Sequence, residues 1–249
     1  MKIASLITYC TNEYRFIKHC IDHAKPFSDQ IIVSSSDCFF DGEKENRELL
    51  DRTYQENLTA EFIESEWTPG HDIRYWCNMA RYVGSQQLHD DIDWVVLLDS
   101  DEIFDTELFI DFLNTTDFQH VSYKLANYYY FREPIYQSVQ WEDSIVLCQR
   151  RVFNVDVTHP YHERGQYSEM LVNEPVLRHV THSNGLPMIH HYSWVRTKDQ
   201  MLKKVQKWWH APDRPDWTQL VEEEFTHPFT GKDFLHPYEY KTVENKWNI

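Results

Sequence analysis

The chain has 249 residues, which is enough for one large α/β domain with a substantial core. Its 40 acidic and 24 basic residues give a formal net charge of −16, which disfavours broad contact with nucleic acid or with an anionic membrane. The five cysteines form no CxxC pair, no apolar run reaches the length of a membrane span, and the first residues lack a signal peptide. We therefore expect a cytoplasmic chain with no transmembrane segment and no nucleic-acid partner.

The first hundred residues alternate apolar runs with amphipathic segments. Strands are predicted at 3–9, 30–36, 59–64 and 94–98, and helices at 13–24, 41–56 and 73–88. Strands that alternate with helices are typical of a parallel sheet with right-handed crossovers. Residues 1–104 are therefore predicted to form a Rossmann-type nucleotide-binding lobe.

After residue 104 the pattern changes, and the segments become rich in aromatic residues. Strands are predicted at 121–131, 144–152 and 188–195, and a helix at 197–209. The tail from residue 211 is read as irregular coverage. Aromatic residues make up 15% of the chain, and clefts lined by Tyr and Trp suit sugar rings or nucleobases. No clear linker separates the halves, so residues 1–249 are expected to form one domain with two lobes, 1–104 and 105–249.

The most informative stretch begins at Trp94 with a buried, Val- and Leu-rich strand that ends in Asp99, Asp101 and Glu102. Like charges repel and burial adds to their cost, so a cation is expected there. Two carboxylates two residues apart can hold Mn²⁺ or Mg²⁺, which in turn binds phosphates. The simpler alternative is a turn in which Asp101 only caps the next helix.

A second motif is the pair His190-His191, in a predicted strand that leads into a basic helix. Strand alternation places His191 and Ser193 on one face. A histidine can complete the coordination of a cation held by carboxylates. The alternative, that these histidines only form hydrogen bonds within the strand, is equally compatible with the residues.

The densest basic cluster in this acidic chain follows that pair. Its members are Arg196, Lys198, Lys203, Lys204 and Lys207. Cationic groups at a helix start can neutralise a leaving diphosphate. Helical spacing does not allow all of them to face one cleft, so Lys203 and Lys207 are expected on a solvated face.

A third element is the acidic pair Glu142-Asp143, which follows Trp141. Adjacent carboxylates beside an aromatic ring can hold an acceptor hydroxyl and take its proton. An exposed acidic turn is the alternative.

Together, WVVLLDSDEIF, HHYSWVR followed by MLKK, and WEDSIVLCQRR resemble motifs of the family 2-like glycosyltransferases with the GT-A fold. Ser193 replaces the usual Gly of the second motif, and Arg150 falls one residue later than usual in the third. The resemblance covers about residues 1–210. It implies an α/β fold, in which a Rossmann-like αβα sandwich with a mixed, mostly parallel sheet is fused to an acceptor-binding lobe.

The resemblance also implies roles for individual residues. The residues expected near the nucleobase are Thr8, Tyr9, Asn12 and Asp37. Other expected donor contacts are Arg74, Asn78, Asp99, Ser100, Arg196 and Lys204, the last two at the diphosphate. The expected cation ligands are Asp99, Asp101 and His191. Asp143 is implied as the catalytic base, with Glu142 beside it.

The predicted function is therefore metal-dependent transfer of a sugar, in glycan synthesis, from a uridine or guanosine diphosphate sugar to an acceptor hydroxyl. A nucleotidyltransferase is the strongest rival, but it would usually carry a Gly-rich loop after the first strand, and residues 9–14 contain no Gly. The other rival is a non-catalytic module that binds a nucleotide sugar or a glycan.

Overall fold

The computed structural model describes the chain except for residues 72, 155–175 and 209 and the side chains of residues 74, 153 and 154. The strands are β1 (Ile3–Thr8), β2 (Gln30–Ser36), β3 (Glu61–Ser65), β4 (Trp94–Asp99), β5 (Glu102–Phe104), β6 (Ser122–Phe131), β7 (Tyr136–Gln149), β8 (Leu177–Val180), β9 (Ile189–Trp194) and β10 (Tyr240–Thr242). The α-helices are α1 (Tyr14–Ala24), α2 (Arg47–Glu56), α3 (Ile73–Ser85), α4 (Thr106–Thr115), α6 (Lys198–Lys207) and α7 (Trp217–Glu224). None of them combines the length and apolar character needed to cross a bilayer.

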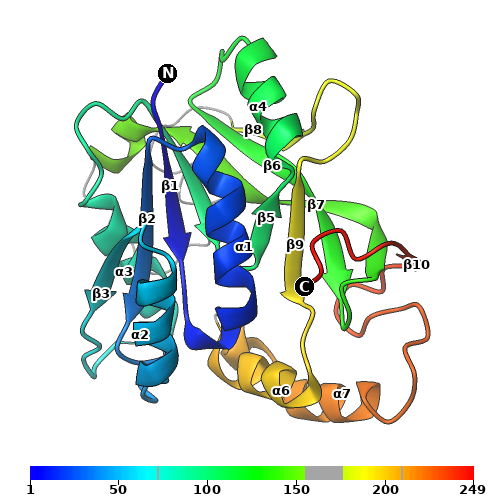
Figure 1. Cartoon of the computed structure of the whole chain (residues 1–249). Coiled ribbons are helices and arrows are strands. Elements are labelled where there is room, and N and C mark those ends of the chain that lie inside the picture. The colour runs from blue at the N-terminus through cyan, green and yellow to red at the C-terminus, as the bar shows by residue number, and fades with distance from the viewer. Residues whose placement is uncertain (72, 155–175, 209) are drawn as a thin grey trace.

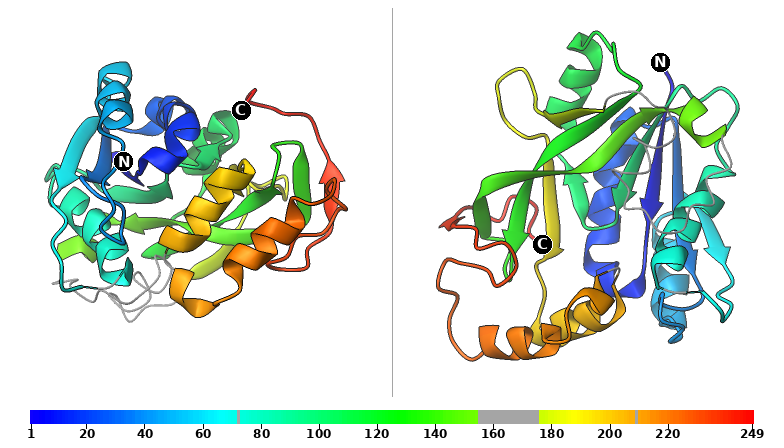
Figure 2. Two further views of the ribbon diagram at one scale, coloured as in Figure 1. Left: turned by 90° about the horizontal axis from the view of Figure 1, so that it is seen from below. Right: turned by 180° about the vertical axis from the view of Figure 1, so that it is seen from behind.

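The strands form one mixed sheet in the order β3-β2-β1-β4-β7-β6-β9-β5, with β8 added to β6 and β10 added to β7. Strands β1 to β4 are mutually parallel, whereas β7 and β5 run against their neighbours. Helices cover both faces (Figures 1 and 2). The predicted α/β class with a mixed, mostly parallel sheet is therefore confirmed.

In the first hundred residues, the predicted strand 30–36 coincides with β2, and the other three match within two residues. The predicted helix 41–56 is shorter, because α2 begins at Arg47. The residues before it form a turn in which Gly42 adopts a φ of +89°, and Cys38 pairs with Lys44 in an isolated β-bridge. Asn46 then caps the helix by accepting a hydrogen bond from the Leu49 N–H at 3.2 Å.

The second half differs more from expectation. Strand β7 starts eight residues before the predicted start at residue 144. It ends at Gln149, before the predicted end at residue 152, and a short 3₁₀ helix (Arg150–Asn154) follows it directly. The tail is not irregular throughout, since it contains α7 and β10. Trp217 and Val221 of α7 are buried against Trp194 of β9 and Val205 of α6. This helix thus depends on aromatic partners that are distant in sequence.

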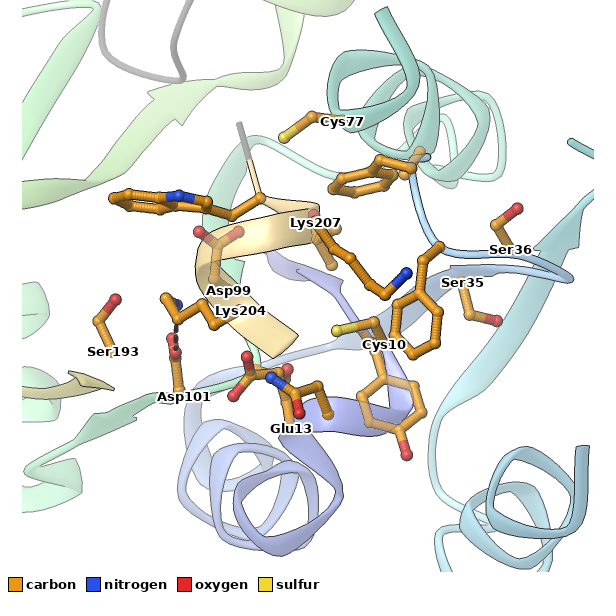
Figure 3. Close-up of a pocket in the computed structure, with 18 of the residues that line it drawn as sticks. Cys10, Glu13, Ser35, Ser36, Cys77, Asp99, Asp101, Ser193, Lys204 and Lys207 are labelled. Carbon is orange, nitrogen blue, oxygen red and sulfur yellow. Dashed lines mark ion pairs between the residues drawn. The ribbon is translucent and has the colours of Figure 1, made fainter. Parts of the chain in front are cut away.

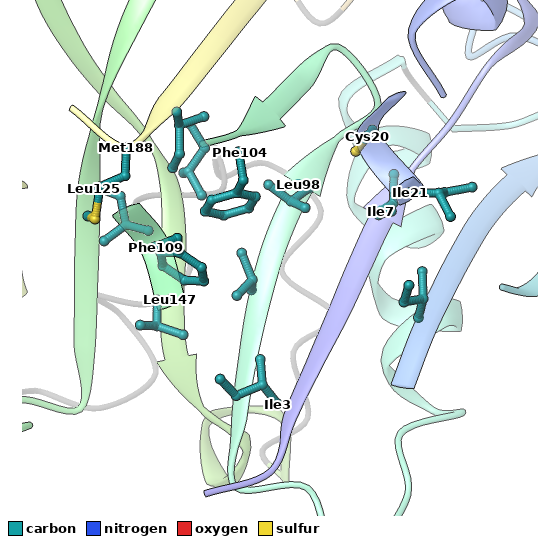
Figure 4. Packing of buried hydrophobic residues seen from close by; sticks show 14 of the residues in the cluster. Ile3, Ile7, Cys20, Ile21, Leu98, Phe104, Phe109, Leu125, Leu147 and Met188 are labelled. Carbon is teal, nitrogen blue, oxygen red and sulfur yellow. The ribbon is translucent and has the colours of Figure 1, made fainter. Parts of the chain in front are cut away.

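The largest hydrophobic cluster lies between one face of the sheet and helices α1, α2 and α4 (Figure 4). Ile3 and Ile7 of β1 face this cluster, whereas Ala4 and Leu6 face a second cluster on the side of α3. This alternation follows the side-chain period of a strand that is buried on both faces. The two clusters hold the carboxyl ends of the central strands in fixed positions.

The sheet order reverses direction at β1, which lies between β2 and β4. In α/β sheets, ligands bind at the carboxyl ends of strands at such a switch point. Thr8 ends β1 directly beside Asp99, which ends β4. Helix α6 lies below this edge in Figure 1, so the fold brings the basic helix to the acidic strand end.

Candidate functional site

A cavity of about 340 Å³ lies at this edge, between the carboxyl ends of β1, β2 and β4 and helix α6 (Figure 3). Many of the residues predicted to bind donor or metal line it, namely Thr8, Tyr9, Asn12, Asp99, Ser100, Asp101, His191 and Lys204. Segments far apart in the sequence therefore meet at one cavity.

Asp101 is the most constrained of these residues. Its side chain is 5% exposed, and its Oδ2 accepts a hydrogen bond from Arg196 at 3.1 Å and lies 3.9 Å from Lys204 Nζ. Its Oδ1 is buried and accepts no hydrogen bond from the described residues. The Nε2 atom of His191 lies 3.6 Å from that oxygen. A buried carboxylate oxygen without a donor normally has a missing partner.

Arg196 does not line the cavity, although it was predicted to contact the diphosphate. Its guanidinium lies behind Asp101, is 1% exposed, and also pairs with the carboxylate of Glu13. Burial raises the pKa of Glu13, an effect that the charge of Arg196 opposes. Of the two basic residues predicted at the diphosphate, Lys204 lines the cavity and Arg196 does not.

Asp99, which was predicted as a donor contact and cation ligand, lines the cavity and is contacted by side chains from two other parts of the chain. Its Oδ1 accepts a hydrogen bond from Arg81 Nη2 at 3.0 Å, and its backbone N–H donates to Glu102 Oε2 at 2.7 Å. Arg81 lines the cavity and was not singled out from the sequence. Asn78 lies one helical turn before it and accepts a weak hydrogen bond from it at 3.4 Å. Asn78 is thus adjacent to the cavity, while the side chain of Arg74 lies outside the described part of the structure.

The residues present fit a divalent cation only in part. Two ligands of one Mg²⁺ or Mn²⁺ ion, each at about 2.1 Å, lie up to about 4.2 Å apart, so Asp101 Oδ1 and His191 Nε2 can share one. Within the described ranges, no group of three His, Cys, Asp or Glu side chains is arranged to hold a metal. A cation here would therefore complete its shell with water and phosphate oxygens, as Mg²⁺ commonly does.

The two histidines of the pair differ completely. His190 is buried among aromatic rings, and its Nδ1 shares a hydrogen bond with the Tyr130 hydroxyl at 2.7 Å. Burial lowers its pKa to about 3, so it is a neutral core residue. His191 faces the cavity, and its Nδ1 lies 3.5 Å from Ser144 Oγ and 3.9 Å from Glu142 Oε2. The hydrogen-bonding alternative thus applies to His190, whereas the role of His191 as a cation ligand stays a prediction.

Glu142 and Asp143 also have different surroundings. Asp143 accepts two hydrogen bonds from Arg178, at 2.9 and 3.0 Å, and lies 3.7 Å from Lys124 Nζ. Burial acts to raise its pKa, but these cations lower it overall. Among the residues that the structure describes, no Lys or Arg pairs with Glu142, and burial raises its pKa to about 7 although the charge of His191 opposes the shift. Neither residue forms the exposed acidic turn that was the alternative.

The cavity end expected to hold the nucleobase is lined by Ser35, Ser36, Cys38 and Phe39. Asp37 does not line it, because its carboxylate accepts hydrogen bonds from the Trp67 N–H at 2.8 Å and from Lys44 at 2.6 Å.

Glu45 lines this end of the cavity instead of Asp37, and its carboxylate accepts from the N–H and hydroxyl of Thr11. No sequence pattern distinguishes Glu45 from the other charges of the segment 41–48.

Helix α6 spans the cavity. It begins in a capping box formed by Thr197 and Gln200. Lys203 Nζ lies 3.9 Å from the centre of the Phe39 ring, and Lys207 pairs with Asp41 and Glu43. The expectation that Lys203 and Lys207 lie on a solvated face was therefore wrong, because the loop before α2 meets them.

The fold is similar to those of solved transferases, at low sequence identity. The inositol-1-phosphate CTP transferase from T. maritima is 9% identical with a TM-score of 0.49, over 83% of this chain and 97% of that one. A 4-diphosphocytidyl-2C-methyl-D-erythritol synthase from Anaerococcus prevotii is 10% identical with a TM-score of 0.46, over 80% and 92%. The glycosyltransferase GlyE of Streptococcus pneumoniae is 16% identical with a TM-score of 0.41, over 93% and 66%. No family model and no curated protein matches the chain.

Proposed function

We propose that this protein is a metal-dependent glycosyltransferase that uses a nucleoside diphosphate sugar. The observation that carries the proposal is the buried Asp101 Oδ1, which accepts no hydrogen bond from the described residues and lies 3.6 Å from His191 Nε2, with Lys204 near the same carboxylate. A Mn²⁺ or Mg²⁺ ion held by Asp101 and His191 would supply positive charge to the leaving diphosphate. Lys204 adds a second positive charge from the protein itself.

The rest of the cavity suits the remainder of such a donor. The nucleoside end fits the side lined by Ser35, Ser36 and Phe39, where the aromatic ring can contact a base. Arg81, which donates to Asp99 at the end of β4, also lines the cavity and can donate to ribose or sugar hydroxyls. We propose uridine or guanosine diphosphate as the carrier, as the resemblance implies.

We assign the role of general base to Glu142 and not to Asp143. The carboxylate of Glu142 accepts no hydrogen bond from the described residues and lies beside His191, whereas two cationic side chains hold that of Asp143. In the proposed step, Glu142 takes the proton of the acceptor hydroxyl while the acceptor oxygen forms a bond to the anomeric carbon. The bond from that carbon to the diphosphate oxygen breaks, and the electron pair leaves with the diphosphate. Direct displacement of this kind inverts the anomeric centre.

The proposal is tested by product analysis with uridine and guanosine diphosphate sugars and Mn²⁺. Release of free nucleoside diphosphate is the expected result. Release of pyrophosphate from a nucleoside triphosphate and a sugar phosphate would instead identify a nucleotidyltransferase, and binding without turnover would identify a binding module. Asp101→Asn is expected to abolish release, whereas Asp117→Asn, on an exposed loop after α4, is the matched control.

A further inference from the structure

We infer that the C-terminal segment 233–240 forms the acceptor subsite, and that the acceptor group it takes is a neutral sugar ring. The inference rests on the proposed glycosyl transfer and extends it to the acceptor. It starts from a segment that the sequence marks only as an acidic, Pro-containing tail.

Asp233 organises this segment. Its Oδ1 accepts the backbone N–H groups of Leu235 and His236, both at 2.6 Å, and its Oδ2 accepts the hydroxyl of Tyr240 at 2.7 Å. Tyr240 begins β10, which pairs with β7 opposite Ser138. A buried carboxylate with three hydrogen bonds fixes a turn firmly. The segment is therefore held against the strand that also carries Glu142.

The segment presents two rings beside the reaction site. The rings of His236 and Tyr238 stack with centroids 4.9 Å apart and an interplanar angle of 21°. The buried ring of Tyr129 packs edge-on against His236 at 5.4 Å. The side chain of His236 remains 38% exposed, so a molecule in solvent can reach it. Stacked, partly exposed aromatic rings suit the apolar face of a pyranose.

Polar groups with free hydrogen-bonding capacity lie next to these rings. Glu142 Oε2 is 3.9 Å from His191 Nδ1 and Glu142 Oε1 is 4.0 Å from His236 Nδ1, and both distances exceed a hydrogen bond. The buried hydroxyl of Tyr129, whose ring packs against His236, has no hydrogen-bond partner among the described residues. A ligand that carries several hydroxyl groups can satisfy both Glu142 and His236.

The charge of the cluster selects between acceptor classes. Within the described part of the chain, neither Glu142 nor Asp233 forms an ion pair with Lys or Arg. The carboxylate of Asp233, and that of Glu142 when it is ionised, therefore bring negative charge without a cationic partner, which repels a phosphate or carboxylate. The subsite therefore suits an uncharged sugar ring and not a phosphorylated acceptor.

The test is saturation-transfer NMR on the full chain with Mg²⁺, uridine or guanosine diphosphate, and methyl glycopyranosides of glucose, galactose, mannose and N-acetylglucosamine. A saturation-transfer signal from at least one glycoside is expected with the unmodified chain. His236→Ala with Tyr238→Ala should reduce it about tenfold, whereas His227→Ala, an exposed histidine of the same tail, should leave it unchanged. His236→Gln preserves much of the side-chain volume and should still reduce it several-fold if the double variant fails to fold.

Nucleotide signals recorded in the same samples separate the two proposals. Binding of the nucleotide without binding of any glycoside would overturn the acceptor subsite and leave the proposed function standing. Equal glycoside signals in His236→Gln and the unmodified chain would also overturn it, as would preferential binding of glucose 1-phosphate over methyl glucoside. Absence of nucleotide binding in the unmodified chain would count against the proposed function.

Discussion

His191 Nε2 lies 3.6 Å from Asp101 Oδ1, although the two side chains come from different segments of the chain. The relationship is produced by the antiparallel pairing of β5 with β9, in which Glu102 lies opposite His191. The backbone N–H of Tyr192 also donates to the carbonyl of Asp101 at 2.9 Å. The acidic turn and the histidine are thus fixed by the sheet itself, before any ion binds.

Replacement of His191 should weaken cation binding. His191→Ala removes one of the two proposed protein ligands, so Mn²⁺ affinity in the presence of uridine or guanosine diphosphate should fall by about tenfold or more. Electron paramagnetic resonance of free Mn²⁺ measures this directly, without turnover. His182→Ala is the control, since His182 pairs with Asp111 away from the cavity. Equal affinity in the two variants would remove His191 from the metal site.

The acidic pair on β7 gives a second prediction. Glu142→Gln should lower kcat about 100-fold or more, because the proton acceptor is lost. Asp143→Asn should leave turnover near normal but lower the midpoint of thermal unfolding, because Arg178 and Lys124 lose their shared anionic partner. Steady-state kinetics and thermal unfolding of both variants check this. The opposite pattern, with turnover lost in Asp143→Asn, would return the role of base to Asp143.

The elements best predicted from the sequence are those with continuous apolar runs. Such a run, as in β2, buries both faces of the strand and leaves few alternatives, so its limits coincide with the prediction. The helix α7 was not foreseen, because its apolar stripe is short and its stability depends on Trp194 and other distant aromatics. Local pattern carries little information where tertiary partners decide the structure.

The same contrast holds in the site. Asp101 and His191 were predicted because charged residues interrupt or end apolar strands, which is visible in one segment. The contact of Asp99 with Arg81 was not predicted, because the two residues come from different elements. Asp37 directly follows β2, the position from which a contact with the nucleobase was predicted. Its carboxylate instead accepts hydrogen bonds from Lys44 and from the Trp67 N–H. Side-chain partners across loops cannot be read from spacing.

Glu45 should make the folded state less stable as the pH rises. Burial raises its pKa from 4.5 to about 6, although hydrogen bonds from Thr11 oppose the shift. A carboxyl group with a raised folded-state pKa favours folding most below its unfolded pKa, and that contribution is lost as the pH rises from about 4.5 through about 6. The shift corresponds to about 2 kcal/mol. In Glu45→Gln this component is absent, so the difference in unfolding free energy between variant and unmodified chain should change between pH 4 and pH 7. Urea unfolding at the two pH values measures it, and parallel pH profiles would contradict it.

Gly84 allows α3 to pack closely on strands β1 and β2 of the sheet. A Cβ atom at this position would overlap Cδ1 of the buried Leu6 and lie 3.3 Å from Ser34 Cβ. Gly84→Val should therefore destabilise the fold by about 1–3 kcal/mol, since a well-packed core accepts added volume poorly. Gly84→Ala should cost less, because alanine adds one carbon and favours the helix by up to about 1 kcal/mol. Because α3 also carries Asn78 and Arg81, the displaced helix should weaken nucleotide binding in Gly84→Val more than in Gly84→Ala. Urea unfolding and nucleotide titration of both variants test the relation, and unchanged stability in Gly84→Val would show that the helix can move away from the sheet without loss of packing.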